Sequence, residues 1–401
     1  MTLVLCDSAG EVLGALPSFE VALPYWQEVA DVVAGAQERA GLDVTVLRLL
    51  CARTSSPAEG GPVTYLGEVS GPMTGLLPWA GPGVVSHDDP LRLPYARPGG
   101  PGRDLAWADA QLAARGMERT GPARQIRTWN LSSIWRVPSS GGAAWLKAVP
   151  PFFAHEGAML SRIGRDHPGL VPELLGTEGP RVLMVDVPGG DHYDAPLPVL
   201  LTLVRALVGL QVEWSARVPE LEQLGVPDWR VDTFCPAAQD VVARTSAALD
   251  AETLSTLRGL LDGIAGRFED VADCGIPDSL VHGDFHPGNA CGPPQQPVLL
   301  DWGDCGVGHP LLDQTAFTAR LPDADRAEVL AEWSRLWRDA TPGCDPARAA
   351  RLLAPVAALR QAIVYRSFLD NIEATEHVYH AEDPAAWLRR AAALEAGPDP
   401  H

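Results

Sequence analysis

The segment SLVHGDFHPGNACGPPQQPVLLDWGD, residues 279–304, constrains the fold more than any other part of the chain. Its apolar start predicts a strand that ends at Val281, and Asp284 then precedes Asn289 by five positions. Two short strands flanking a turn are expected over GNACGPPQQPVLL, and the second would deliver Asp301. Loop ends would therefore bring an Asp, an Asn and a second Asp to one site.

Such a set suits phosphoryl transfer. One carboxylate can accept or orient the proton of the attacking hydroxyl, while an amide oxygen and a second carboxylate hold Mg²⁺ against nucleotide phosphates. The five-residue spacing is a weak signal by itself, and its weight comes from His282-Gly283-Asp284 at a strand end followed by Asn289 and Asp301. The structural alternative is an ordinary pair of turns rich in Asp, Asn and Gly.

These motifs resemble the aminoglycoside phosphotransferase and choline kinase branch of the protein-kinase-like fold. That family's catalytic loop is similar to H-G-D-x-x-x-x-N, and its metal-binding Asp lies in D-x-G-x-x-x-G. The chain has His282 to Asn289 and DWGDCGVGHPLLD from Asp301. The resemblance implies that Asp284 is the catalytic base and that Asn289 and Asp301 are Mg²⁺ ligands. The sequence departs from the family pattern at His309, because GHP stands where the family often has GDP.

The family also implies a strand lysine that pairs with a helix glutamate and clamps the nucleotide phosphates. Lys147, in AAWLKAVP, is the only lysine among 31 Lys and Arg residues, and Glu156 follows nine positions later in the first turn of an expected helix. A compact ammonium can bridge phosphate and carboxylate in a narrow space, whereas a planar guanidinium is larger. The alternatives are a strand-end lysine that reaches water and a first-turn glutamate that only favours the helix.

The resemblance implies that the protein uses ATP and Mg²⁺ as cofactors. It also implies further residues that contact the nucleotide. The phosphate-covering loop should lie around residues 129–137, where Ser132 and Ser133 stand in place of glycines; a plain hairpin turn is the alternative. LMVDVPGGD resembles the hinge between the lobes, where backbone groups of Asp186 and Val187 would contact adenine.

The acceptor site is expected in the helical lobe. Near the chain's end, Asp370, Glu373 and Glu376-His377 fall at three- and four-residue spacing, so an expected helix over 346–377 would present them on one face. An acidic face suits an amine-bearing acceptor, and a solvated helix face is the alternative. The candidate acceptor contacts are Asp191, Asp194, Trp229, Asp370 and Glu373.

The predicted fold class is α+β, a bilobal protein-kinase-like fold preceded by a small α+β domain. The expected parts are an N-terminal domain (1–80), a Pro/Gly-rich linker (81–102), a strand-rich lobe (103–187) and a helical lobe (188–401). The N-terminal domain faintly resembles a Nudix fold with a degenerate helix, in which Gly35 and Arg39 stand where two of three metal carboxylates would be and Ala34 stands in place of the motif's arginine. We interpret it as a non-catalytic module that shapes the acceptor site or a dimer contact.

Charge and cysteine content narrow the class of protein. The net charge of −20 argues against nucleic acid as a partner and suits a cationic small molecule, although an acidic surface also favours solubility alone. Seven scattered cysteines without a CxxC pair favour reduced thiols in a cytoplasm over disulfides or a zinc site. A signal peptide and an apolar stretch long enough to span a bilayer are not expected. We therefore expect a cytoplasmic protein without a membrane partner.

Together these features predict an ATP- and Mg²⁺-dependent kinase that phosphorylates a hydroxyl of a small molecule. The acceptor classes left open are an aminoglycoside-like antibiotic, a nucleoside, an amino alcohol and a sugar. A catalytically silent nucleotide-binding module is the main alternative. Hydrolysis of a nucleoside diphosphate derivative by the N-terminal domain is disfavoured by the missing carboxylates.

Overall fold

In a computed structural model of the protein, residues 1–22, 25–52, 61–71, 75–79, 81 and 89–397 are described. The chain divides into two compact units, and each combines segments that are distant in sequence. Unit 1 comprises Met1–Gly157, Leu174–Asp186 and Phe368–Ala381, and unit 2 comprises Ala158–Glu173, Val187–Ser367 and Glu382–His401. Unit 1 thus holds the expected N-terminal domain together with most of the expected strand-rich lobe, while residues 158–173 of that lobe belong to unit 2.

The N-terminal part of unit 1 is a four-stranded sheet with the strand order β2-β1-β4-β3. Strands β1 and β4 are parallel, and the other pairs are antiparallel. Helix α1 packs its apolar face on this sheet and ends at Gly41, whose φ of 66° is left-handed as a helix end often requires. The bounds are β1 (Thr2–Cys6), β2 (Val12–Ala15), α1 (Ala30–Ala40), β3 (Val44–Ala52) and β4 (Val63–Val69).

The amphipathic pattern of residues 25–41 predicts a helix over that whole range, but the helix begins at residue 30. The residues before it pair with strand β5 (Arg124–Trp129), because Val29 donates to the Ile126 carbonyl at 3.0 Å and Thr128 donates to the Gln27 carbonyl at 3.0 Å. The Gln125 side chain adds two hydrogen bonds to the main chain of Val46. The N-terminal part of unit 1 therefore covers the edge of the next sheet, where unpaired backbone groups would otherwise remain.

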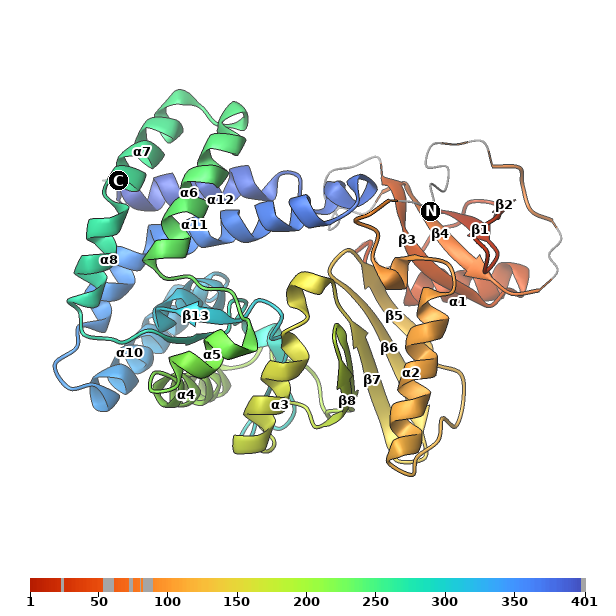
Figure 1. Ribbon diagram of the computed structural model, residues 1–401, viewed down its shortest axis with the longest axis horizontal. Helices are drawn as coiled ribbons and strands as arrows, with labels where there is room; N and C mark the ends of the chain where they lie inside the picture. Colours follow the sequence, from red (N-terminus) through yellow and green to blue (C-terminus); the bar gives the residue numbers. More distant parts are fainter. Residues whose placement is uncertain (23–24, 53–60, 72–74, 80, 82–88, 398–401) are drawn as a thin grey trace. The chain divides into compact units, whose positions relative to one another are not determined.

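The second sheet of unit 1 has five strands in the order β5-β6-β7-β9-β8. Helix α2 lies along this sheet (Figure 1) and packs Trp107 and Leu112 against Leu146 and Leu183. The strand register places Lys147 opposite Ile134 on one side and Val182 on the other. The bounds are α2 (Gly100–Ala114), β6 (Ser132–Ser139), β7 (Gly142–Ala148), β8 (Leu174–Glu178) and β9 (Arg181–Val185), with helix α3 (Glu156–Asp166) beginning in this unit.

The expected linker is described at residue 81 and from residue 89 onward, and its described part is ordered. A short 3-10 helix, η2 (Pro94–Ala96), buries Tyr95, whose hydroxyl donates to the Trp129 carbonyl at 2.9 Å. Arg92 is also buried. Leu93, Tyr95 and Ala96 of this segment are therefore part of the core of unit 1.

Unit 2 is mostly helical. The helical pattern of residues 237–268 predicts one long helix, but the structure divides it, because Asp250 caps a new helix by accepting from the Thr253 N–H at 2.8 Å and Gly263 ends that helix. Strand β10 pairs with β13, and β11 pairs with β12. The elements are α4 (Leu197–Trp214), α5 (Val218–Leu224), α6 (Val231–Thr245), α7 (Ala251–Asp262), α8 (Ile264–Ala272), β10 (Ser279–Val281), β11 (Ala290–Cys291), β12 (Val298–Leu299), β13 (Gly306–Gly308), α9 (Gln314–Thr318), α10 (Asp323–Ala340), α11 (Pro346–Asn371) and α12 (Asp383–Ala396).

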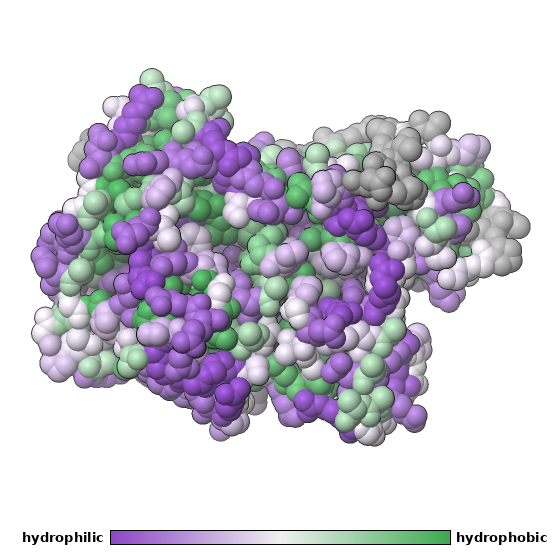
Figure 2. All heavy atoms as spheres, viewed as in Figure 1, coloured by the Kyte–Doolittle hydropathy of each residue, from purple (hydrophilic) through white to green (hydrophobic). Residues whose placement is uncertain are grey.

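Two helices of unit 2, α4 and α11, are long and apolar enough to cross a membrane by length and composition, contrary to the expectation from the sequence. Within their most apolar windows 44% and 61% of the residues are buried, and the core helices of soluble proteins meet the same criteria. Hydrophilic and apolar side chains are interspersed on the visible face of each unit (Figure 2). All seven cysteines are free thiols.

Candidate active site

The loop after β10 is fixed through its backbone. Asp313 accepts hydrogen bonds from the N–H groups of His282 and Gly283, both at 2.8 Å, and its carboxylate also accepts from the Gln211 side chain at 2.9 Å. Gly283 has a φ of 88°, and a Cβ there would lie 2.0 Å from the Asp304 carbonyl oxygen. Arg360 donates to the Gly283 carbonyl at 2.9 Å. Glycine is therefore required here, directly before Asp284.

His282 connects this loop with the segment that carries Asp301. Its Nε2 lies 3.0 Å from the Leu300 carbonyl oxygen, and its ring packs on Trp302 with centroids 4.4 Å apart. Complete burial lowers the pKa of His282 to about 4, so the imidazole is neutral at pH 7 and donates from Nε2. The histidine of the HGD motif is thus a structural link between two loops.

Asp284 and Asn289 lie side by side at the two ends of the loop. The Asn289 amide nitrogen donates to the Asp284 backbone carbonyl at 2.9 Å and to its carboxylate at 3.0 Å. These bonds leave the Asn289 carbonyl oxygen as the ligand atom of that side chain. The Asp284 side chain is 42% exposed, so its carboxylate remains accessible to a substrate.

Asp301 follows β12 and has a φ of 61°, the only positive φ among the described non-glycine residues. Such backbone strain concentrates at functional sites, where the surrounding structure enforces it. The charge of the Asp301 carboxylate also affects the pKa of Asp284. Burial of the surrounding loop raises the pKa of Asp284, His286 lowers it, and the Asp301 charge raises it. The Asp284 proton affinity is therefore tuned upward, as general-base chemistry favours.

The donor set fits a magnesium ion. The Asp301 carboxylate and the Asn289 carbonyl oxygen are the hard ligands of the set, and the Asp301 charge lies close enough to Asp284 to raise the pKa of that residue. Within the described residues, no cluster of three or more His, Cys, Asp or Glu side chains is arranged to hold a metal by itself. That pattern suits Mg²⁺, which is usually bound by one or two carboxylates together with substrate phosphates and water.

In unit 1, Lys147 pairs with Glu156 as predicted from the sequence. The Lys147 Nζ lies 2.7 Å from the Glu156 Oε1, and the residues are only 9% and 1% exposed. Strand β7 supplies the lysine, and the first turn of α3 supplies the glutamate. The next residue must be glycine, because a Cβ at Gly157 would lie 2.1 Å from the Thr177 hydroxyl. Close packing of α3 on β8 therefore holds the pair.

Comparison with known proteins decides the family. The model of the phosphotransferase enzyme family, APH, matches residues 126–351, more than half of the 401 residues. The chain belongs to the phosphotransferase enzyme family. Its protein-kinase-like fold and its class, a small-molecule phosphotransferase, are as predicted from the catalytic-loop motifs. The match begins at residue 126, so the Nudix resemblance of the N-terminal domain gains no support from it.

Solved structures with this fold include three phosphotransferases. Macrolide 2′-phosphotransferase MphH from Brachybacterium faecium has a TM-score of 0.50 and 18% identity, covering 74% of this chain and 100% of that one. Choline kinase LicA from Streptococcus pneumoniae has a TM-score of 0.50 and 10% identity, covering 73% and 99%. A thermostable mutant of aminoglycoside phosphotransferase APH(4)-Ia, in a ternary complex with AMP-PNP and hygromycin B, has a TM-score of 0.50 and 18% identity, covering 73% and 99%. A search of curated proteins gives no significant match.

The residues expected to contact the nucleotide in this phosphotransferase are partly engaged elsewhere. Ser132 and Ser133 are buried, and each hydroxyl accepts from an indole N–H at 3.1 Å, from Trp129 and Trp135 respectively. The tip of the β5–β6 hairpin is Asn130–Leu131, one position earlier than the serines. The serine hydroxyls are therefore engaged inside the hairpin, and the backbone of that turn is left as the candidate for the predicted phosphate-covering role.

The structure also reduces the number of backbone groups that could contact adenine at the expected hinge. The Asp186 N–H donates to the Ala143 carbonyl at 3.0 Å, which extends the pairing of β9 with β7. The Asp186 carboxylate accepts from the Trp145 indole. The Asp186 N–H is thus used inside the sheet, and the proposed adenine contacts reduce to its carbonyl and the main chain of Val187.

Three of the acceptor candidates lie in unit 2. Trp229 packs under the Arg360 guanidinium, 4.4 Å from the ring centroid, and so is joined to the catalytic loop through the bond from Arg360 to Gly283. Asp191 forms an isolated bridge with Cys291, two residues after Asn289. Asp194 is exposed on the same turn as Asp191. The structure therefore brings Trp229 and Asp191 to the loop that carries Asp284.

The acidic face expected near the chain's end is not formed. Helix α11 ends at Asn371, and a 3-10 helix, η7 (Ala374–Tyr379), follows in unit 1. Glu373 is 5% exposed and pairs with Arg92 at 2.8 Å, so its carboxylate is already neutralised inside the core. Asp370 is exposed on the last turn of α11. Glu373 is thus corrected from a candidate acceptor contact to a core ion pair.

Residues that position the loop were missed in the sequence. Asp313 ends the segment DWGDCGVGHPLLD, and Arg360 is a lone charge in the apolar run APVAALRQAIVY, which was a usable signal. Burial raises the pKa of Asp313 to about 6 even though the hydrogen bonds from the His282 and Gly283 amides lower it, so the carboxylate is largely ionised at pH 7. His309, where the family often has Asp, accepts from the Leu311 N–H at 3.2 Å and orders the turn leading to Asp313.

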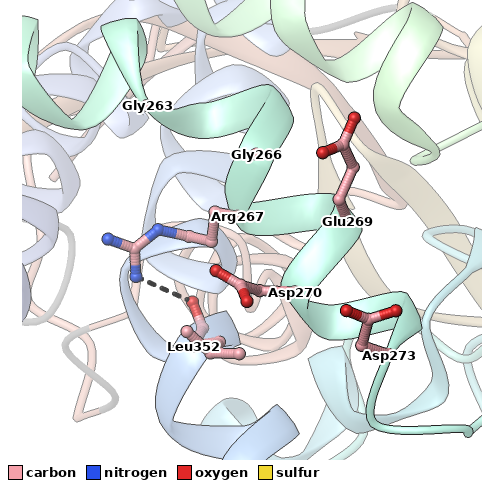
Figure 3. Close-up of a pocket in the computed structure, with 7 residues that line it drawn as sticks. All are labelled: Gly263, Gly266, Arg267, Glu269, Asp270, Asp273 and Leu352. Atoms are coloured by element: carbon pink, nitrogen blue, oxygen red, sulfur yellow. Dashed lines mark hydrogen bonds between the residues drawn. The ribbon is translucent and has the colours of Figure 1, made fainter.

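A separate pocket of about 500 Å³ lies beside α8 (Figure 3). Three carboxylates line it, but Asp270 pairs with Arg348 at 2.6 Å, and Arg267 crosses it to donate to the Leu352 carbonyl at 3.2 Å. None of the predicted site residues lines this pocket. It is therefore no part of the candidate active site.

Proposed function

We propose that this protein transfers the γ-phosphate of Mg·ATP to a hydroxyl group of a small molecule. The observation that carries the proposal is the catalytic loop, in which Asp313 and Arg360 hold the backbone before Asp284 and Asn289 donates to the Asp284 carboxylate at 3.0 Å. Preorganised groups of this kind supply most of the catalysis in phosphoryl transfer.

Each residue of the set has a separate task. Asp284 takes the proton of the acceptor hydroxyl, and its raised pKa favours that transfer. Asn289 and Asp301 hold Mg²⁺, which neutralises the phosphate oxygens when bound. Lys147, oriented by Glu156, binds phosphate oxygens of the same nucleotide. The structural relative bound to AMP-PNP supports a nucleoside triphosphate as the donor.

The acceptor class rests on chemistry and on the relatives. The net charge of −20 favours a cationic molecule, and the relatives include a complex with hygromycin B and a choline kinase, whose ligands are amine-bearing alcohols. An aminoglycoside-like antibiotic or an amino alcohol is therefore preferred to a nucleoside or a neutral sugar. Trp229, Asp191 and Asp194 are the proposed acceptor contacts, the cytoplasm is the proposed location, and the N-terminal domain is a proposed homodimer contact.

The test is ADP release from Mg·ATP across a library of amine-bearing and neutral alcohols. We expect acceptor-dependent turnover that Asp284→Asn abolishes and that the exposed change Asp323→Asn leaves unchanged. Turnover that survives Asp284→Asn would refute the role of Asp284. Stabilisation by Mg·ATP without turnover on any acceptor would instead indicate a silent nucleotide-binding module.

A further inference from the structure

The β5–β6 turn, Asn130–Leu131, is hydrogen-bonded to residues 376 and 380, which lie far along the chain. The His380 Nε2 lies 3.1 Å from the Asn130 Oδ1, and the Asn130 amide nitrogen donates to the Glu376 carbonyl at 3.4 Å. The amide nitrogen must face that carbonyl, so the Asn130 oxygen is the acceptor and His380 donates from Nε2. Asn130 and His380 are 2% and 4% exposed, so this contact is sealed from water. We call residues 373–380 the clasp segment.

Aromatic contacts also join this segment to the strand before the turn. The Trp129 ring lies 5.5 Å from Tyr379 and 5.6 Å from His380, between centroids. Tyr379 in turn meets Trp26 edge-on at 5.8 Å. The Tyr95 hydroxyl donates to the Trp129 carbonyl at 2.9 Å. Residues from three other parts of the sequence, around Trp26, Tyr95 and Tyr379, therefore fix this hairpin within unit 1.

The clasp segment is itself anchored to the N-terminal domain. Glu373 pairs with Arg92 at 2.8 Å and with Arg48 at 3.4 Å, all with buried side chains. The Glu376 carboxylate accepts from the Leu49 N–H at 3.2 Å on strand β3. Buried ion pairs with good geometry contribute little net stability, but breaking one is costly, so such contacts specify a single arrangement. The N-terminal domain thus determines where the clasp segment lies.

We propose that the clasp segment holds the β5–β6 turn in its nucleotide-binding conformation, with His380 as a positioning residue. This inference rests on the proposed function, which assigns the turn's backbone to the phosphates of ATP. A turn that is already ordered loses little conformational entropy when the nucleotide binds. The protein therefore binds the nucleotide more tightly than it would with a disordered turn. The additional N-terminal domain then has a role, because it supports the segment that orders this turn.

The experiment compares His380→Ala with His380→Gln and with the control His167→Ala, which removes a half-exposed histidine just after α3. Hydrogen exchange of residues 126–135 is measured without nucleotide, and KM for ATP and kcat are measured with Mg²⁺ present. Loss of one buried hydrogen bond should speed the exchange and raise KM for ATP by about three- to tenfold in His380→Ala, with kcat changed less than about twofold. The side-chain amide introduced by His380→Gln can still donate to Asn130, so this variant should recover most of the effect.

The outcomes separate this inference from the proposed function. Unchanged exchange in His380→Ala would refute the clasp, whether or not the protein turns over ATP. Faster exchange with an unchanged KM for ATP would refute the positioning role. A fall in kcat that His380→Gln does not rescue would indicate general structural damage and would also refute it. Wild-type protein that binds no Mg·ATP would overturn the proposed function, while the exchange rates would still report on the clasp.

Discussion

The Asp313 carboxylate accepts a hydrogen bond from the backbone N–H of Gly283 at 2.8 Å, and so reaches the catalytic loop one residue before Asp284. The second bond, from the His282 N–H, makes the contact bidentate. Charge-assisted bonds to a fully buried carboxylate hold a loop more firmly than neutral ones. The orientation of Asp284 therefore depends on a side chain that touches no substrate.

Replacing Asp313 with Asn should impair catalysis without preventing the acceptor from binding. The amide can accept from only one of the two N–H groups, and its own NH₂ would face the other donor, which leaves buried groups unsatisfied. We expect a loss of about 1–3 kcal/mol in the free energy of unfolding and a clear fall in kcat, with KM for the acceptor little changed. Urea unfolding and steady-state kinetics measure both, with Asp323→Asn, whose side chain is 95% exposed, as the control. Wild-type kcat in Asp313→Asn would contradict this role.

Gly283→Ala should be more damaging than an alanine at another left-handed glycine. Gly225, at the end of α5, has a φ of 71° and open space within 4 Å of where a Cβ would stand, whereas a Cβ at residue 283 would lie 2.0 Å from the Asp304 carbonyl. Gly225→Ala should therefore cost about 1–2 kcal/mol from the backbone alone and keep activity. Gly283→Ala should cost more and abolish turnover. Thermal unfolding and ADP release check the pair, and equal losses would show that the close approach is unimportant.

Lys147→Arg, conservative in charge, should cripple phosphoryl transfer while the fold survives. The ammonium sits 2.7 Å from Glu156 in a site where Lys147 is 9% exposed, and the larger planar guanidinium cannot present its charge in the same place. We expect a fall of roughly 10²-fold in kcat/KM for ATP. Circular dichroism should match wild type, and the reverse exchange Arg124→Lys, at an exposed position of the same sheet, should have no effect. Near-normal turnover in Lys147→Arg would make the solitary lysine an accident of composition.

Asp301→Asn should change the dependence on magnesium. Asn tolerates the left-handed φ of 61° at this position, so the backbone should be preserved. Loss of one anionic ligand should raise the Mg²⁺ concentration that gives half-maximal activity by at least about tenfold. Titration of activity with Mg²⁺ after treatment with EDTA measures this shift. An unchanged midpoint would remove Asp301 from the proposed ligand set.

Glu376 should make unit 1 less stable at alkaline pH. Burial and, to a smaller extent, the Glu373 charge raise the pKa of Glu376 from 4.5 to about 8, although the Leu49 amide and two arginines lower it. Because the folded pKa is the higher one, its stabilising contribution is complete below pH 4.5 and is lost as pH rises through 8. Wild-type protein should lose up to about 1.4 kcal/mol per pH unit relative to Glu376→Gln across that window. Urea unfolding at about pH 5, 7 and 9 tests this, with exposed Glu328→Gln as the control; parallel pH profiles would contradict it.

Local sequence was sufficient for the catalytic loop and for the lysine–glutamate pair. Asp284, Asn289 and Lys147 lie in short motifs whose neighbours along the chain build the site, so spacing carries the information. The same holds for β1 and for α4, whose apolar patterns match their burial.

Long-range contacts explain where the sequence was insufficient. Helix α1 begins at residue 30 because Val29 bonds to Ile126, which lies far along the chain. Glu373 pairs with Arg92 across 281 positions, and a periodic pattern cannot show such a partner. The serine hydroxyls at 132 and 133 are an exception, because they accept from Trp129 and Trp135, which are only three and two positions away along the chain.

The split composition of unit 1 has a consequence for synthesis. Tyr379 belongs to the core formed by β1, α1 and β3, and the clasp segment satisfies Arg92 and Asn130. On the ribosome, chains fold from the N-terminus as it emerges. Strands β1 and β3 are therefore made well before the segment Phe368–Ala381 that belongs to their unit, and their core is completed only after that segment has left the ribosome. A chain truncated before residue 373 would lack Tyr379 and leave this core open.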